Sequence, residues 1–187
     1  MANYLFVTIT EMEAPIESVW PEVSRPERWA TWWPGLVTVT QLEPGDEESR
    51  GSLQQLTFKS KLPYKLSFQA RIARLDPMQR MDIEAVGELE GLAVYELEDL
   101  GGRTRMQLTW SVKTTKMWMN VLAPVARPFF EWNHDVLMKA GMRGLAQKLG
   151  VQVISFEAGH PLRGTLKVGL NVMAVWWLWK RFARRNR

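Results

Sequence analysis

The sequence predicts an α+β fold in which an antiparallel sheet of about seven strands is covered by one long C-terminal helix. Residues 36–114 alternate between apolar and polar side chains, with short turn sequences between the alternating segments, which is the pattern of an antiparallel meander. Residues 117–150 instead repeat their apolar side chains at helical spacing. A sheet with one apolar face needs a cover, and this helix is the only element long enough to provide it.

One strand and two short helices are expected before the meander. Residues 4–10 are rich in β-branched and aromatic side chains and form the first strand. Pro15 suits the first turn of a helix, and apolar residues at helical spacing follow it. The Ser-Arg-Pro-Glu run that starts at Ser24 has the spacing of a capping box, which predicts a second helix over residues 26–33.

The meander is expected to contain six strands. They cover residues 36–43, 51–60, 64–75, 81–86, 88–98 and 103–114. Their alternation separates an apolar face from a polar face, as in a sheet with one side on the core and one side in water. The apolar face carries Phe68, Tyr95 and Trp110, whereas the acidic side chains fall on the polar face.

The long helix has an apolar face with two unusual features. Its centre carries Asn133, with His134 at its flank, and its later turns contain Gly141 and Gly144. A glycine inside a helix costs about 1 kcal/mol relative to alanine, so we expect something large or close to fit against this face. We therefore predict that the helix closes one side of an internal cavity. Gly150 is a natural C-terminal stop.

The composition excludes several classes of site. The chain has no cysteine, so it can form neither a disulfide nor a thiolate nucleophile. The sequence has no metal-spaced cluster of histidines and carboxylates, no phosphate-binding glycine loop and no nucleophile elbow. We therefore expect no metal and no cofactor. The N-terminus lacks a basic region followed by a long apolar core, so the expected location is the cytoplasm.

The chain divides into a body, residues 1–150, and a tail, residues 151–187. Of the 24 basic residues, seven follow Glu157, where no acidic residue occurs, so the rest of the chain holds 17 basic and 20 acidic residues. A mildly acidic body argues against nucleic-acid binding. Residues 151–162 are expected to be a linker or one stray strand.

The end of the tail has the composition of a helix that lies in a membrane interface. Its apolar part, residues 168–179, would be about 18 Å long as a helix, too short for a hydrocarbon core of about 30 Å. Tryptophans lie beside basic residues that suit anionic head groups. These residues are Trp176, Trp177, Trp179, Lys180, Arg181, Arg184 and Arg185. On this interpretation the protein is peripheral to a membrane, and the alternative is that the helix docks on the body or on a second protomer.

Two segments of the body, one before most of the strands and one after them, carry a resemblance to a known family. They are EAPIESVWPEVSRPERWATWWPGL before most of the strands and FFEWNHDVLMKAGMRGLAQKL after them. Over residues 4–150 the chain resembles the START-like superfamily, in its polyketide cyclase/dehydrase and lipid-transport branch (SRPBCC). The resemblance implies the helix-grip fold, a curved antiparallel sheet wrapped around a long C-terminal helix with a deep apolar cavity between them. Members bind, carry or cyclise hydrophobic ligands such as lipids, sterols and polyketides.

The long helix supplies the polar candidates for a ligand site. Asn133 points into its apolar face and can orient a ligand carbonyl or hydroxyl, and the alternative is a bond to a strand carbonyl or a nearby hydroxyl. His134 is a candidate general base at the cavity rim, but we favour a structural or solvent-edge role. Glu131 and Asp135 fall on the polar face, where Asp135 can pair with Lys139.

Aromatic side chains complete the expected site. Trp29, Trp32 and Trp33 are expected to line the cavity, with its mouth near the second short helix. The predicted ligand contacts are Asn133, His134, Tyr95, Trp110, Phe130, Leu137, Phe68 and Trp33. The leading hypothesis is a carrier that binds a hydrophobic small molecule, either a lipid or a polyketide-like compound. The alternatives are a cyclase/dehydrase-type enzyme that uses the same cavity for positioning, and an interaction module with a filled core and a dimerising tail.

Overall fold

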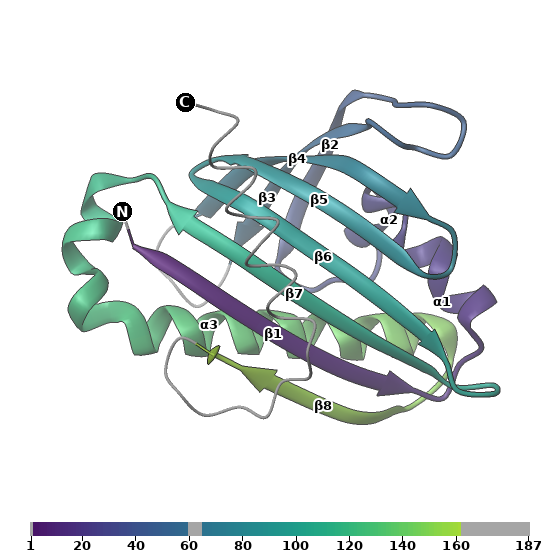
Figure 1. Ribbon diagram of the computed structural model, residues 1–187. Helices are drawn as coiled ribbons and strands as arrows, with labels where there is room; N and C mark the ends of the chain where they lie inside the picture. Colours follow the sequence, from purple (N-terminus) through teal and green to yellow (C-terminus); the bar gives the residue numbers. More distant parts are fainter. Residues whose placement is uncertain (1, 60–64, 162–187) are drawn as a thin grey trace.

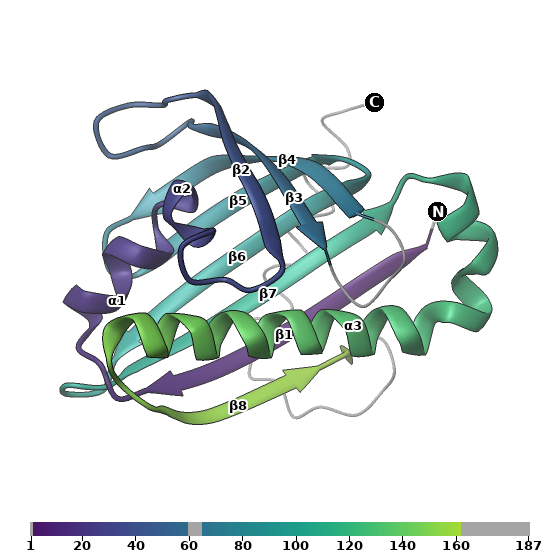
Figure 2. The ribbon, with the colours of Figure 1, turned by 180° about the vertical axis from the view of Figure 1, so that it is seen from behind.

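The computed structural model describes residues 2–59 and 65–161 and confirms the α+β helix-grip architecture (Figures 1 and 2). One antiparallel sheet of eight strands has the order β2-β3-β4-β5-β6-β7-β1-β8. The strands are β1 (Asn3–Met12), β2 (Leu36–Glu43), β3 (Leu53–Lys59), β4 (Lys65–Asp76), β5 (Arg80–Gly87), β6 (Leu89–Asp99), β7 (Thr104–Thr114) and β8 (Val153–Gly159). The meander predicted from the alternating pattern is therefore the central part of the sheet.

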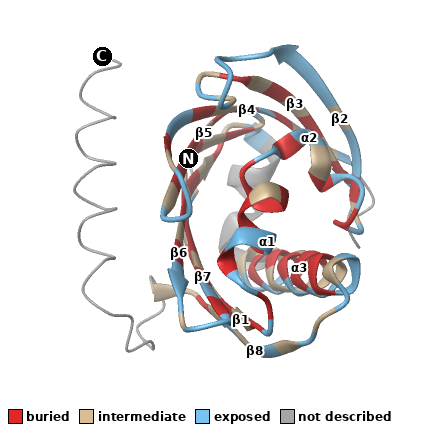
Figure 3. Ribbon diagram, turned by 90° about the vertical axis from the view of Figure 1, so that its right-hand side faces the viewer, coloured by how far each residue is buried: buried red, intermediate tan, exposed pale blue. Residues whose placement is uncertain are grey.

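Three helices lie on one side of this sheet. They are α1 (Ile16–Val23), α2 (Pro26–Trp29) and α3 (Met117–Leu149). Figure 3 shows the sheet curving around α3, with α1 and α2 on the same concave side. The inward residues of the strands are mostly buried, whereas most of the outward ones are partly or largely exposed, as the alternation predicts.

The second short helix differs from its prediction. It ends at Trp29, four residues earlier than expected, and its N-cap residue is Arg25, with no side-chain cap. Ser24 instead ends α1, because its backbone N–H donates a hydrogen bond of 2.8 Å to the oxygen of Trp20. The predicted capping box is therefore wrong, since α1 and α2 follow each other so closely that Ser24 terminates the first helix.

The segment after α3 extends the sheet. Gly150 ends α3 in the left-handed conformation, with φ of 70°, as expected for a glycine stop. β8 then pairs antiparallel with β1, from Val7 opposite Gly159 to Met12 opposite Val153. The part of the chain predicted to be a linker or stray strand is thus an edge strand, and the sheet continues beyond the expected body.

The tail residues predicted to meet a membrane or a second protomer, within 176–185, lie outside the described residues. In the part of the chain that the structure describes, no helix combines the length and the hydropathy needed to cross a bilayer.

The two glycines in α3 permit close contact with the chain itself. A Cβ atom on Gly144 would lie 1.8 Å from the backbone oxygen of Trp32, and one on Gly141 would lie 2.6 Å from the indole nitrogen of Trp33. The expectation that something close fits here is confirmed. The occupant is the tryptophan pair after α2, so the later turns of α3 pack against the protein's own aromatic residues.

Candidate ligand cavity

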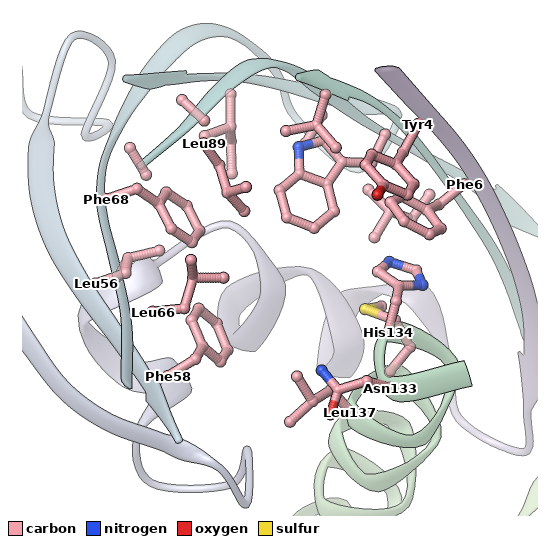
Figure 4. A pocket seen from close by; sticks show the side chains of 18 of the residues that line it. Tyr4, Phe6, Leu56, Phe58, Leu66, Phe68, Leu89, Asn133, His134 and Leu137 are labelled. Carbon is pink, nitrogen blue, oxygen red and sulfur yellow. The ribbon is translucent and has the colours of Figure 1, made fainter. Parts of the chain in front are cut away.

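A cavity with a volume of about 150 Å³ lies between the concave face of the sheet and the middle of α3. In Figure 4, Phe58 and Phe68 approach it from β3 and β4, while Tyr4 and Phe6 lie on the opposite side above His134. An apolar cavity of about 150 Å³ accommodates a benzene ring. This cavity is not fully enclosed, so a longer ligand can extend beyond it.

The cavity brings together the eight residues predicted to contact a ligand. Its lining includes Trp33, Phe68, Tyr95, Trp110, Phe130, Asn133, His134 and Leu137. Trp29 also lines it, whereas Trp32 does not. Trp32 is nevertheless buried, stacked on Trp33 with 5.5 Å between the ring centroids.

Sequence reasoning missed the contribution of β1. Tyr4 and Phe6 are buried and line the cavity, because β1 lies between β7 and β8 and turns these two rings inward. Both alternating sets of residues in β1 contain apolar side chains, so alternation alone does not identify the inward face. The signal that was available is the pair of aromatic rings at positions i and i+2, which share one face of a strand.

The lining is apolar and uncharged. Nine of its residues are aromatic, and none is a lysine, arginine, aspartate or glutamate within the described ranges 2–59 and 65–161. Burial raises the pKa of the Tyr95 hydroxyl, so this group stays neutral. The same ranges contain no group of three or more potential metal-binding side chains. The lining therefore favours a neutral apolar ligand.

Three polar atoms of the lining are buried without a hydrogen-bond partner among the described residues. They are the hydroxyl of Tyr4, Oδ1 of Asn133 and Nε2 of His134. Buried polar groups normally have partners, and an unpartnered one costs about 1–3 kcal/mol. Three such atoms around one apolar cavity indicate that a ligand or water completes their hydrogen bonds.

His134 does not occupy the predicted solvent edge. It is only 7% exposed and forms part of the cavity wall. Its imidazole stacks on the Phe6 ring, with 3.9 Å between centroids and 16° between planes, and lies 5.7 Å from the Trp110 ring. The helical wheel places His134 only at the flank of α3, but the sheet curves around that flank and covers it. Burial lowers the pKa of His134, against the opposite effect of its contact with Asp135.

Asp135 is also placed differently from its prediction. Its Oδ1 lies 3.4 Å from Nδ1 of His134, and its Oδ2 lies 3.0 Å from Nε2 of His160. The predicted partner Lys139 instead lies over the ring of Phe156, 5.9 Å from its centroid. Burial acts to raise the pKa of Asp135, but hydrogen bonds from both histidines hold that pKa below its usual value.

Glu131 is a third correction on α3. It was expected on the polar face, but it is buried and accepts a hydrogen bond of 3.0 Å from Nε of Arg127. The guanidinium of Arg127 in turn lies 5.2 Å from the centroid of the Tyr4 ring. The buried Glu131 carboxylate is therefore paired with a partly exposed arginine that lies next to Tyr4 of the cavity wall.

Comparison with known proteins decides the family. The model of the family described as polyketide cyclase/dehydrase and lipid transport matches residues 6–150. The chain belongs to this family. A search of curated protein sequences gives no match.

Solved structures with the same fold are distant in sequence. The Zhui aromatase/cyclase from Streptomyces sp. R1128 has a TM-score of 0.66 and 17% identity, over 79% of this chain and 93% of that one. A START superfamily protein from Mycobacterium smegmatis has a TM-score of 0.65 and 13% identity, over 79% and 97%. Norcoclaurine synthase from Thalictrum flavum, solved with dopamine and hydroxybenzaldehyde, has a TM-score of 0.54 and 10% identity, over 79% and 87%. At these identities the likeness shows the fold alone.

Proposed function

We propose that this family member binds a neutral hydrophobic small molecule, a lipid or a polyketide-like compound, in the cavity between its sheet and α3. The observation that carries the proposal is the cavity lining, which contains nine aromatic residues and no charged one within the described chain. Apolar walls with a few polar groups are typical of small-molecule sites. The presence of this cavity disfavours the alternative of an interaction module with a filled core.

Two neighbouring residues on β5 allow a matched test. Ala85 lines the cavity, whereas Val86 is 54% exposed on the opposite face of the sheet. We expect Ala85→Phe to fill the cavity and to weaken binding of naphthalene at least about tenfold, because the added ring removes the space the probe needs. Val86→Phe adds an aromatic ring outside the cavity and should leave binding unchanged. Quenching of tryptophan fluorescence measures both affinities.

Native mass spectrometry of the purified protein provides an independent test. A ligand retained in the cavity adds a defined mass to the wild-type protein and to Val86→Phe, but not to Ala85→Phe. Equal binding of naphthalene by wild-type protein and Ala85→Phe would overturn the proposed site.

The second candidate function is a cyclase/dehydrase-type enzyme that uses the same cavity. It is favoured by the three unpartnered polar atoms of Tyr4, Asn133 and His134 in an otherwise apolar site. Polar atoms in such a site suit an enzyme, because they can orient a reacting chain. Turnover of a polyketide-like substrate by the purified protein tests this candidate.

A further inference from the structure

Asp135 joins two histidines that come from different parts of the chain. It contacts its neighbour His134 on α3 and also His160, which follows β8. The Phe6 ring is shared by both histidines, because it stacks on His134 and meets His160 edge-on, with 5.5 Å between centroids. His160 lies beyond the residues matched by the family model. The group of His134, Asp135 and His160 therefore depends on β8, the strand after α3 that brings His160 to Asp135.

The contacts of Asp135 fix where the protons lie. Its pKa is held below the usual value, so the carboxylate is ionised near neutral pH and accepts hydrogen bonds only. Nδ1 of His134 and Nε2 of His160 face this carboxylate and must each carry a hydrogen. A neutral imidazole has one N–H and one lone pair, and burial keeps His134 neutral by lowering its pKa. Its lone pair is consequently on Nε2.

That lone pair belongs to the cavity wall. Nε2 of His134 is buried and has no partner among the described residues, and His134 itself lines the cavity. The unpartnered hydroxyl of Tyr4 and amide oxygen of Asn133 lie in the same lining. Figure 4 shows the His134 ring below Tyr4 and Phe6 and above Asn133, facing the space between α3 and the sheet. The cavity wall thus contains both a proton acceptor and a hydroxyl donor.

The surroundings of the imidazole are largely apolar. The charged or titratable groups that act on it are Asp135 on α3, which it contacts, and His160 after β8, while β1 and β7 present the rings of Phe6 and Trp110. The next titratable group along β1 is Tyr4, beside the Arg127 guanidinium on α3. Stacking on Phe6 holds the ring plane, and Asp135 holds its rotation.

We propose that His134 is a catalytic base that removes a proton from the carbon next to the carbonyl of a ketone bound in the cavity. The C–H bond breaks, its electron pair forms the enolate, and the proton forms a new N–H bond at Nε2. The Tyr4 hydroxyl donates to the enolate oxygen, and the reverse transfer returns a proton to carbon, so the step needs no oxidant or reductant. Asp135 and His160 are positioning residues that keep the Nε2 lone pair directed at the ligand. This inference rests on the proposed ligand-binding function of the same cavity.

Deuterium exchange into 2-tetralone tests the proposal directly. This neutral two-ring ketone loses its acidic C–H signals in the proton NMR spectrum when deuterium from D₂O replaces them. We expect wild-type protein to accelerate the exchange about 100-fold or more over His134→Gln, which is the usual scale of general-base catalysis. Trp132→Gln introduces the same side chain at a site on α3 that is 47% exposed, and it should exchange as fast as wild type.

Variants of the positioning residues separate catalysis from structure. Asp135→Asn should slow exchange and lower the pH at which activity is half-maximal, because the carboxylate that raises the pKa of His134 is lost. His160→Leu should slow exchange, and His160→Gln should restore it, since a glutamine amide can also donate to Asp135. If His134→Gln does not fold, the Asp135→Asn pH profile and the His160 pair still decide the proposal.

Binding is measured in the same samples by displacement of naphthalene. If 2-tetralone binds and its exchange is no faster than in buffer, the base is overturned while the binding function stands. If naphthalene binds and 2-tetralone does not displace it, the ketone class is wrong and the proposal falls. If naphthalene does not bind either, the proposed function fails as well.

Discussion

The indole nitrogen of Trp33 donates a hydrogen bond of 2.9 Å to the backbone oxygen of Leu137 in α3, across 104 positions of sequence. This bond fixes the end of the turn after α2 against the helix at the point where Leu137 enters the cavity lining. The Trp33 ring also meets Phe58 on β3 edge-on, with 5.5 Å between centroids. One side chain therefore connects the short helices, the long helix and the sheet at one side of the cavity.

Removal of this indole donor should destabilise the protein. Trp33→Phe keeps an aromatic ring but loses the N–H and part of the volume packed against Gly141, so we expect the free energy of unfolding to fall by about 1–3 kcal/mol. Trp132→Phe makes the same exchange at a largely exposed position and should change stability by less than about 0.5 kcal/mol. Urea denaturation followed by circular dichroism measures both. Equal effects of the two variants would contradict the bridging role of Trp33.

Gly144 should not tolerate even a methyl group. Its missing Cβ would lie 1.8 Å from the Trp32 oxygen, and this neighbour is backbone, which cannot rotate away. We expect Gly144→Ala to lower the free energy of unfolding by about 1–3 kcal/mol or more, although alanine has the higher helix propensity. Gln147→Ala, at an exposed site on the same helix, should be neutral within about 0.5 kcal/mol. A stabilising Gly144→Ala, measured by thermal unfolding, would show that α3 does not approach the tryptophan pair this closely.

The periodic parts of the fold could be predicted from the sequence. Alternation located the strands because each strand buries one face, and it identified the inward set that contains Phe68, Tyr95 and Trp110. The β8 segment, VISFEAG, could be predicted only as a linker or one stray strand, because its contribution lies mainly in backbone pairing with β1 and most of its side chains are only half-buried. Backbone pairing at a sheet edge leaves little pattern in the side chains.

The polar part of the candidate site was less predictable, because the positions of its side chains depend on how the sheet packs around α3. A helical wheel gives the direction of a side chain from its own helix but not how far the sheet curves around that helix. Asn133 faces the interior on the wheel and in the structure, whereas His134 is buried against Phe6 of β1 and Asp135, which is only partly buried, contacts His160. His160 follows β8, so the helical pattern of α3 alone does not connect it to Asp135.

Asn133 should contribute to ligand selection and reduce stability. Its Oδ1 is buried and unpartnered among the described residues, so Asn133→Leu should raise the free energy of unfolding by about 1 kcal/mol. The same change should weaken binding of 2-naphthol about fivefold or more, because it removes a polar partner for the hydroxyl, while binding of naphthalene stays equal or improves. Fluorescence titration with the two probes provides the internal control. Unchanged affinity for 2-naphthol would exclude Asn133 from ligand recognition.

The stability of the protein should fall as the pH is lowered below the ordinary histidine range. Burial lowers the pKa of His134 from 6.5, so between that value and its folded pKa the unfolded chain binds a proton that the folded chain does not. Unfolding is then favoured progressively as the pH falls from 6.5 through the folded pKa of His134. Asp135, whose pKa is also lowered, adds a second loss from its unfolded value of 3.8 downward.

Two measurements separate these contributions. The chain contains two histidines, so their ring C–H signals can be followed individually by NMR, and the signal absent from His134→Gln should titrate below 6.5. Urea unfolding between pH 7 and pH 5 should show a decline in wild-type stability that is reduced in His134→Gln, because glutamine binds no proton. Trp132→Gln should retain the full decline. If the His134 signal titrates at or above 6.5, the imidazole is not held neutral by burial, and its Nε2 is not a free acceptor at neutral pH.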